Sequence, residues 1–481
     1  INAEYGDMIF NLLAVFSVDI NVMMPLTLIN NNGQLVDKIK LINDLKKLKE
    51  AKVNGVMIDV WWGIAEKQPN KYNFDGYAEF FKVAVELKYK IQPVMSFHKC
   101  GGNVGDDCNI PLPEWAASVA LQSGAFYTDQ NGNQQDEYIS SSADQQSIFP
   151  SNTTAKRTPI QIYSDFMAAF ASRFSAYLQN NSMNNIQLGV GPASEMRYPS
   201  YPSRLWQFPG VGRFQAFDPL FKAAALAHGV EIPQVNGTYD SEAQQTDFFT
   251  EGWKTPKGRK FLDFYEEMLF NHTKLIINEA KKSFPHTVMS VKVSGIHWMY
   301  AHESHAAELT AGYMNFERPG IKSGYAHILE KVFGHDVHFD FTCLEMKNAL
   351  QPAQAQSRPE DLVQQVIRTV QEHGAKMGGE NALNVYDKAG FDQITKQIKL
   401  AGVVFDQFTY LRMGDALFQK ENFVQFSKFV DQWVEMSVGA IVGIVIGSVA
   451  VVGALVAVLV IICKKKQAVA EQQALVDNDY T

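Results

Sequence analysis

Two glutamates, Glu195 and Glu380, are the first candidates for chemistry in this chain. Glu195 lies in the run GPASEMRYPSYP, residues 191–202, directly after the apolar run IQLGV. Because proline fixes φ and has no N–H to donate, the Tyr-Pro steps predict a rigid loop after a strand. Two carboxyl groups that flank one bond, one as acid and one as base, are typical of glycoside hydrolysis.

The elements that must position these groups follow a repeated strand–helix pattern. Short apolar, β-branched runs alternate with segments of helical periodicity such as 35–51 and 359–374. The runs begin at Asp19, Gly55, Ile91, Ile186, Thr287, His338, Ala375 and Gln407. The pattern predicts an α/β fold, a closed (β/α)8 TIM-type barrel with long βα loops. A doubly wound open sheet is the alternative, and it is disfavoured because no G-x-G-x-x-G follows the first run.

Polar residues end nearly every one of these otherwise apolar runs. In a parallel barrel the carboxyl ends of the strands carry the active site. A single polar residue there can be an ion pair that closes the rim, as Asp59 with Arg412 could be. So many polar endings instead indicate a binding or catalytic site, formed by Asp59, His98, Glu195, Lys292, His297, Thr342, Glu380 and Arg412.

Charge and cysteine content exclude some partners. The 481 residues carry a net charge of -8, and residues 1–430 contain no basic block, so a nucleic-acid partner is not expected. Cys100 and Cys108 either pair across a short loop or are free thiols, and four cysteines make no disulfide scaffold. The HESH run at 302–305 is not the H-E-x-x-H of zinc peptidases and has no third ligand with supporting spacing, so a zinc site is not expected there. No cofactor is expected.

The end of the chain predicts a membrane anchor. Residues 438–463 form an uncharged apolar run long enough to cross a bilayer, and three lysines follow at 464–466. The positive-inside rule then makes 464–481 a short cytoplasmic tail and places the catalytic domain outside the cell or in a lumen. A weak homodimer through the G-x-x-x-G spacing of Gly439, Gly443 and Gly447 is a further hypothesis.

The predicted domains are therefore a lead-in at 1–18, the barrel at 19–435, the span and the tail. The run Met8–Ser17 is either the remnant of a signal peptide or an element that leads into the barrel. N-x-[ST] sequons agree with an extracellular or lumenal location of a glycoprotein, although a few are expected by chance. They begin at Asn152, Asn180, Asn236 and Asn271.

Several longer motifs carry a family resemblance. They are MIDVWWGIAE, MSFHKCGGNVGDDCNIPLP, GPASEMRYPSYP, KVSGIHWMY, HAAELTAGYMN, DFTCLEM, GGENAL and YLRMGDAL. In this order, over residues 20–430, the chain resembles the β-amylases of glycoside hydrolase family 14. The resemblance implies an inverting exo-hydrolase of α-1,4-glucan that needs no metal and releases β-maltose from non-reducing ends.

The resemblance also implies roles for single residues. Glu195 matches the general acid and Glu380 the general base. Asp106 matches a residue on a mobile loop that closes over substrate, and Thr342 one on an inner loop that responds to substrate. The remaining matches are residues of the glucose subsites: Asp59, His98, Lys292, His297, Asn381, Ala382, Leu383 and Arg412.

These roles make physical demands that a structure can test. A general acid must hold its proton near neutral pH, so its pKa must lie above that of an ordinary glutamate. Because a paired arginine would lower that pKa, we expect Arg197 to point away from Glu195. For an inverting mechanism we expect the two carboxyls to lie about 6.5–9.5 Å apart or slightly more, which leaves room for water, whereas about 5 Å would indicate a retaining enzyme.

The alternative hypothesis is a membrane-tethered glucan-binding receptor or sensor on the same fold with little turnover. Fold alone does not decide between the two, but the site does. A protein that only binds would be expected to lose Glu195, Glu380 or Asp106, and all three are present. The sequence therefore favours the enzyme. One departure from the family is Ser194, a serine where a glycine usually precedes the acid.

Overall fold

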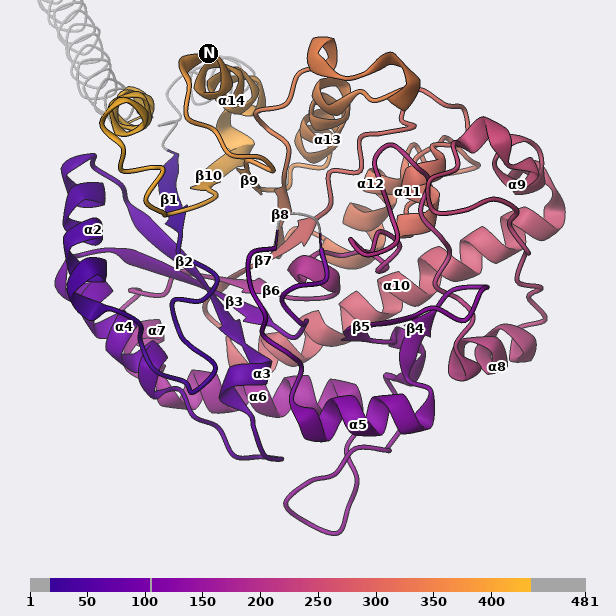
Figure 1. The fold of residues 1–481 in the computed structure, drawn as a ribbon, viewed down its shortest axis with the longest axis horizontal. Coiled ribbons are helices and arrows are strands. Elements are labelled where there is room, and N and C mark those ends of the chain that lie inside the picture. The colour runs from indigo at the N-terminus through magenta and orange to yellow at the C-terminus, as the bar shows by residue number, and fades with distance from the viewer. Residues whose placement is uncertain (1–17, 104–105, 434–481) are drawn as a thin grey trace, which may run out of the picture. The chain divides into compact units, whose positions relative to one another are not determined.

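Eight parallel strands close into a barrel in the computed structural model, which describes residues 18–103 and 106–433. Residues Asp19–Val430 form one compact unit, with helices surrounding the strands (Figure 1). The strand order around the barrel is β1-β10-β9-β8-β7-β6-β3-β2, and each pair is parallel. The strands are β1 (Asp19–Met23), β2 (Gly55–Trp61), β3 (Lys90–Ser96), β6 (Asn185–Leu188), β7 (Val288–Val293), β8 (Val337–Phe341), β9 (Met377–Glu380) and β10 (Phe405–Tyr410). The predicted barrel and its eight strand positions are confirmed.

Burial on both faces explains why these runs are so apolar. Every residue of β2 is buried, because helices cover the outside of the barrel and side chains fill the inside. The interior also holds polar side chains that bond one another across strands. Gln187 Nε2 donates to Asp340 Oδ2 at 2.8 Å, and Gln92 Nε2 donates to Ser290 Oγ at 3.3 Å. The barrel is thus a packed core in which these four polar side chains have partners.

Several outer helices begin at a residue whose side chain caps the helix. The predicted helices at 35–51 and 359–374 are α2 (Lys38–Glu50), capped by Asp37, and α13 (Pro359–Glu372). Thr158 and Gln161 form a capping box at the start of α6 (Pro159–Arg173). The other long helices are α4 (Asp75–Glu86), α5 (Glu114–Ser123), α8 (Pro219–Ala227), α10 (Pro256–Ser283) and α14 (Lys388–Ala401).

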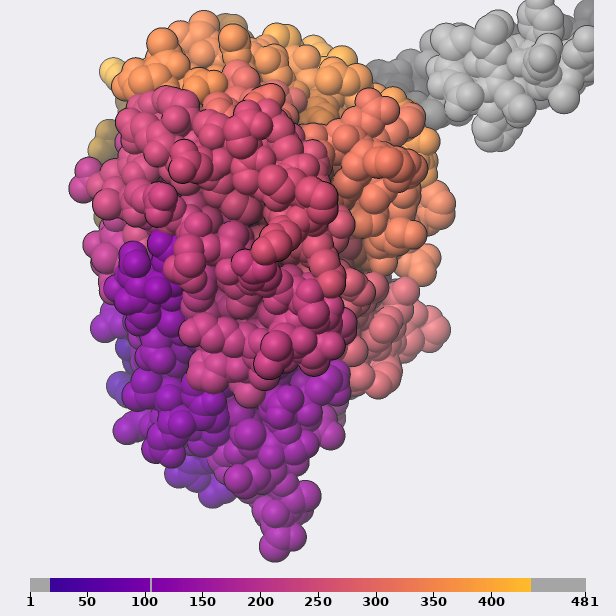
Figure 2. Space-filling model, turned by 90° about the vertical axis from the view of Figure 1, so that its right-hand side faces the viewer, coloured from indigo at the N-terminus to yellow at the C-terminus, as the bar shows by residue number. Residues whose placement is uncertain are grey.

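Two connections are much longer than a single helix. Between β3 and β6 the chain adds α5 and an antiparallel hairpin of β4 (Phe126–Thr128) and β5 (Gln134–Ile139), which the sequence did not predict. Between β6 and β7 it adds α8, the short α9 (Asp247–Thr250) and α10. Figure 2 shows the pink segments of the second connection filling one side of the molecule above purple and magenta segments of the first.

The predicted membrane span is not part of the described structure. Within residues 18–103 and 106–433, no helix combines the length and the apolar character needed to cross a bilayer. The run 438–463, its three glycines and the tail 464–481 lie outside the described residues, and so does the run Met8–Ser17.

Gly189, which follows β6, should tolerate no side chain. Its N–H donates to Met95 O at 3.1 Å, and an added Cβ would lie 2.3 Å from that same oxygen. We therefore expect Gly189→Ala to lower the free energy of unfolding by about 1–3 kcal/mol, measured by urea titration. The control is Gly414→Ala, because a Cβ there would meet nothing within 4 Å. Equal urea midpoints for the two variants would contradict the expected clash.

Candidate active site

Most of the polar strand endings meet in one pocket at the carboxyl end of the barrel, whereas His297 and Thr342 do not line it. Six of the residues singled out from the sequence line it: Asp59, His98, Asp106, Lys292, Glu380 and Arg412. Trp61, Gln187, Ala193, Ser194 and several apolar side chains complete its wall. The backbone of Glu195 bridges to that of Lys292, which brings the acid candidate to the same place. The inference that these distant residues form one site is therefore supported by their positions.

Lys292 links the two glutamates. Its Nζ lies 3.0 Å from Glu380 Oε1, and both side chains are largely withdrawn from water. Burial alone would lower the pKa of Lys292, but the carboxylates of Glu380 and Glu195 outweigh it and raise the pKa. The lysine thus stays charged and supplies the positive potential on which both carboxyls depend.

A strained turn delivers Glu195 to this pocket. Ala193 and Ser194 both adopt left-handed backbone angles, with φ of 52° and 60°. Non-glycine residues rarely adopt this region, and its cost must be offset by local contacts. The hydroxyl of Ser194 supplies such contacts, because it lies 3.2 Å from His98 Nδ1 and 3.4 Å from Ser96 Oγ. The serine in place of the family's usual glycine is thus held by hydrogen bonding.

Arg197 corrects one of our expectations. Its Nε donates to Glu195 Oε2 at 2.6 Å, although we expected it to point away. Ser294 Oγ donates to the same oxygen at 2.8 Å. Burial favours the neutral carboxyl, but the charges of Arg197 and Lys292 outweigh it and hold the pKa of Glu195 below its ordinary value. Glu195 is therefore the more readily ionised of the two glutamates.

Glu380 and Asp59 show the opposite shift. Burial raises the pKa of Glu380, and the nearby Lys292 opposes that effect only in part. Burial likewise raises the pKa of Asp59, against a hydrogen bond that Ser96 Oγ donates at 2.6 Å and the charges of Arg412 and Lys292. The two catalytic candidates, Glu195 and Glu380, therefore differ in proton affinity because their neighbours differ.

Both candidate histidines are neutral hydrogen-bonding groups. Burial, with the charges of Lys292 and Arg197, lowers the pKa of His98 to about 3. Burial lowers the pKa of His297 to about 4, and its Nδ1 lies 2.7 Å from Ser357 Oγ. Neither imidazole carries a charge near neutral pH, which suits contacts with sugar hydroxyls better than proton transfer.

The loops after β8, β9 and β10 are tied together around Asn381. This buried amide bonds the backbone of Leu411 in both directions, at 2.6 and 2.9 Å. Ala382 and Leu383 donate their N–H groups to Glu345, and the Leu383 side chain is 61% exposed. The rim therefore combines a fixed backbone with an exposed apolar side chain. Thr342, at the end of β8, is buried beneath it.

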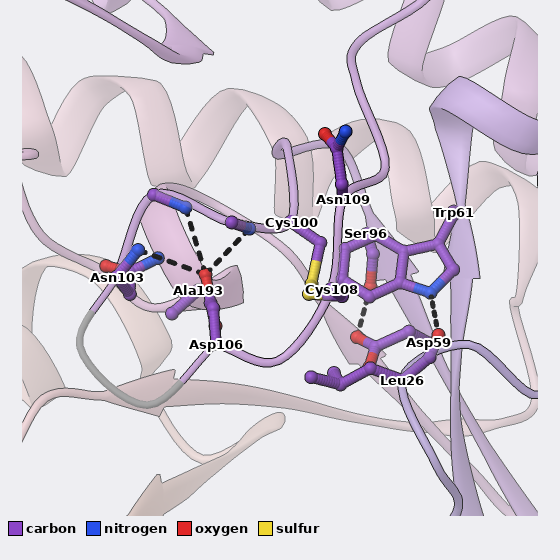
Figure 3. The surroundings of a disulfide bond; sticks show 12 residues. Leu26, Asp59, Trp61, Ser96, Cys100, Asn103, Asp106, Cys108, Asn109 and Ala193 are labelled. Carbon is purple, nitrogen blue, oxygen red and sulfur yellow. Dashed lines mark hydrogen bonds between the residues drawn. A yellow bond between two sulfur atoms is a disulfide. The ribbon is translucent and has the colours of Figure 1, made fainter. Parts of the chain in front are cut away.

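Cys100 and Cys108 form a disulfide that closes the loop of Asp106 (Figure 3). This answers the question that the sequence left open. Within the loop, Asp106 Oδ2 accepts the N–H groups of Gly101, Gly102 and Asn103 at 2.9–3.1 Å. The carboxylate thus organises its own loop at the edge of the pocket.

Sequence reasoning missed several polar residues that support the site. Three of them are carboxyls, buried at Asp340 and Glu137 and partly buried at Glu345. Burial raises the pKa of Asp340 to about 6 and the pKa values of Glu137 and Glu345 to about 7. Asp340 and Glu345 lie in or next to a quoted motif and could have been noticed, whereas Glu137 lies in the hairpin that was not foreseen. Most of the aromatic residues near the motifs, Trp62 and Tyr198 among them, are core residues.

The disulfide should contribute measurably to stability. It joins positions with a sequence separation of 8, so chain entropy predicts a gain of about 2–3 kcal/mol. We expect dithiothreitol to lower the melting temperature of the protein, and Cys108→Ser to lower it equally. The variant itself should be insensitive to the reductant. A melting temperature that dithiothreitol leaves unchanged would contradict this expectation.

Comparisons with known proteins agree with this geometry. The model of glycosyl hydrolase family 14 matches residues 21–439. "Beta-amylase 2, chloroplastic" of Oryza sativa subsp. japonica is 43% identical over 88% of this chain and 78% of its own length. "Beta-amylase" of Vigna unguiculata is 41% identical over 86% of each chain. The crystal structure of the catalytic domain of a beta-amylase from Paenibacillus polymyxa is 28% identical, with a TM-score of 0.70, over 86% of this chain and 98% of that chain.

The predicted location must be corrected. We had predicted a single-pass membrane protein with an extracellular or lumenal catalytic domain. Two of the similar rice proteins are instead named chloroplastic. In the ranges 18–103 and 106–433, moreover, no helix could span a membrane. The prediction is therefore wrong on these findings, and we withdraw it.

Family membership follows from the share of the chain that is matched as well as from the sequence identity. The matched range, residues 21–439, contains all eight barrel strands and the loops that carry the pocket, apart from the first two residues of β1. The similar proteins align over most of their own length, so the likeness is not confined to one motif. The chain belongs to glycosyl hydrolase family 14.

Proposed function

We propose that the protein hydrolyses α-1,4-glucosidic bonds of starch- or glycogen-type glucans by an inverting single displacement, removing β-maltose from non-reducing ends. Membership of the family and beta-amylases 39–43% identical to this chain support starch hydrolysis that releases maltose. The observation that carries the mechanism is that Lys292 pairs with Glu380 at 3.0 Å and that its charge also acts on Glu195. The receptor hypothesis is not favoured.

In this proposal each glutamate moves one proton. Glu380 accepts a proton from water as the water oxygen attacks the anomeric carbon, and Lys292 steadies its carboxylate beforehand. The bond between that carbon and the glycosidic oxygen breaks, and Glu195 gives its proton to the departing oxygen. Attack from the opposite face inverts the anomeric centre, so an α-linkage yields a β-product. The separation of about 6.5–9.5 Å between the carboxyl groups of Glu195 and Glu380, which this mechanism needs, stays a prediction.

The acid must gain proton affinity when the glucan binds. In the ligand-free site Arg197 and Lys292 keep the pKa of Glu195 low. A sugar that fills the pocket removes the remaining water from this carboxyl, and such desolvation favours its neutral form. We propose that the subsites around it are formed by Asp59, His98, Asp106, Lys292, His297, Thr342, Asn381, Ala382, Leu383 and Arg412.

Substitution of the two glutamates tests both the reaction and the roles. With maltopentaose, proton NMR in the first minutes should show β-maltose from the wild-type protein. Glu195→Gln and Glu380→Gln should each lower kcat by about 10²–10⁴-fold, the usual contribution of a general acid or base. With α-maltosyl fluoride, whose leaving group needs little protonation, only Glu195→Gln should recover activity.

Other outcomes would overturn the proposal in different ways. Early α-maltose would indicate a retaining enzyme. Recovery of Glu380→Gln instead of Glu195→Gln on the fluoride would exchange the two roles. Saturable binding of maltopentaose without turnover by the wild-type protein would favour the receptor.

The ion pair of Arg197 should determine where activity falls with rising pH. Glu195 must be protonated to act, so kcat/KM falls about tenfold per pH unit above its pKa in the free enzyme. Since Arg197 lowers that pKa, Arg197→Gln should move the alkaline limb of kcat/KM to higher pH. Ser294→Ala removes an uncharged donor from the same oxygen and should move the limb less. A limb that stays in place or moves to lower pH in Arg197→Gln would contradict this assignment.

A further inference from the structure

Glu137 is a buried carboxyl to which neither the family resemblance nor the proposed mechanism gives a role. It lies in β5, in the hairpin between β3 and β6, and is only 5% exposed. Its Oε1 accepts the backbone N–H of Ala193 at 3.0 Å. The same oxygen accepts the side-chain amide of Asn103. One carboxyl thus bonds the turn before Glu195 and also the loop of Asp106.

Both hydrogen bonds of Glu137 connect it to Glu195, the proposed acid. Ala193 is two residues before Glu195 and has a left-handed backbone, so a bond to its N–H fixes the strained part of the turn. On the other side, Asn103 Oδ1 accepts from Arg197 Nη2 at 2.5 Å, and Arg197 Nε bonds Glu195 at 2.6 Å. The side chains of Glu137, Asn103, Arg197 and Glu195, together with the turn, therefore form a closed ring of contacts.

The loop backbone also packs directly on this carboxyl. A Cβ added at Gly102 would lie 2.9 Å from Glu137 Oε2, so glycine is needed for the approach. The N–H of Lys99 donates to the backbone oxygen of Glu137 at 2.8 Å. The contact between hairpin and loop is therefore continuous rather than a single bond.

We propose that Glu137 is a positioning residue for the acid: it fixes the Glu195 turn against the Asp106 loop and shares the charge of Arg197 with Glu195. This inference rests on the proposed role of Glu195 as the acid. Glu137 touches no substrate in the proposal and acts only through its neighbours.

The charges that face Glu137 give this role a pH dependence. Arg197 and Asp106 act on it, and the Lys99 side chain is engaged elsewhere, with Asp136 at 2.8 Å. Burial raises the pKa of Glu137 to about 7, with Arg197 opposing. Below this pH Glu137 is neutral, and Arg197 acts on Glu195 alone. Above this pH the negative charge of Glu137 offsets part of the effect of Arg197 on Glu195. The pKa of Glu195 is then less strongly lowered, so Glu195 keeps its proton to a higher pH.

Glu137→Gln tests this directly, because the amide oxygen can still accept both hydrogen bonds while the charge is lost. We compare kcat/KM for maltopentaose in the wild-type protein and the variant from pH 5 to pH 8.5. The ratio of wild type to variant should be close to one at pH 5.5. It should rise on the order of three- to tenfold at pH 8, the effect of moving the alkaline limb by about half to one pH unit.

Two further variants make the result decisive. Asp136→Asn removes the same charge from the residue before Glu137 in β5, where the side chain is 64% exposed. The ratio of kcat/KM between the wild-type protein and this variant should stay near one at every pH. Glu137→Ala also removes both hydrogen bonds and should lower kcat/KM at every pH. A pH-independent ratio for Glu137→Gln, or a limb that moves to higher pH, would overturn the inference. Failure of the proposed function is distinguishable, since the wild-type protein would then release no β-maltose.

Discussion

The site depends on the ion pair between Lys292 and Glu380. A charge taken out of water is costly unless a partner of opposite sign lies close to it. The barrel supplies the partners by register: Lys292 stands opposite Asp340 in β8, and Asp340 stands opposite Gly378 in β9. An added Cβ at Gly378 would lie 2.5 Å from Asp340 Oδ1, so glycine leaves room for that carboxyl. The pairing of β7, β8 and β9 therefore places the buried Asp340 carboxyl between Lys292 and a glycine that leaves room for it.

Glu195 and Glu380 have the same chemistry and opposite environments. Arg197 and Ser294 both bond Glu195, whereas Lys292 must serve both carboxyls. This order of pKa values is the reverse of the order that the proposed acid and base need at the moment of reaction. In the proposed mechanism, substrate must therefore change the solvation of Glu195 before the reaction. In that mechanism the turn that holds Glu195 near Arg197 also affects the reactivity of Glu195.

The sequence predicted the barrel well, because each strand is an apolar run and nearly every run ends at a polar residue. Asp59, His98, Lys292, Glu380 and Arg412 could all be placed at one end of the barrel from that pattern alone. Contacts made through irregular backbone could not. The two left-handed residues before Glu195 leave no signal in a pattern of polarity. The orientation of Arg197 was predicted wrongly for another reason, because it was inferred from the high pKa that a general acid needs and not from the local backbone. The hairpin of Glu137 has too few apolar residues to show a strand period.

The loop of Asp106 combines two constraints that act in different ways. The disulfide limits the conformations of the loop whether or not a ligand is present, while Glu137 and Asn103 attach it to the turn of the acid. Asp106 Oδ2 already accepts three backbone N–H groups, so a sugar hydroxyl that bonds this oxygen must compete with all three. Any closure of the loop over a glucan would thus exchange bonds within the loop for bonds to sugar. Because the same loop bonds Arg197 through Asn103, that exchange would also affect the position of Arg197 beside Glu195, the proposed acid.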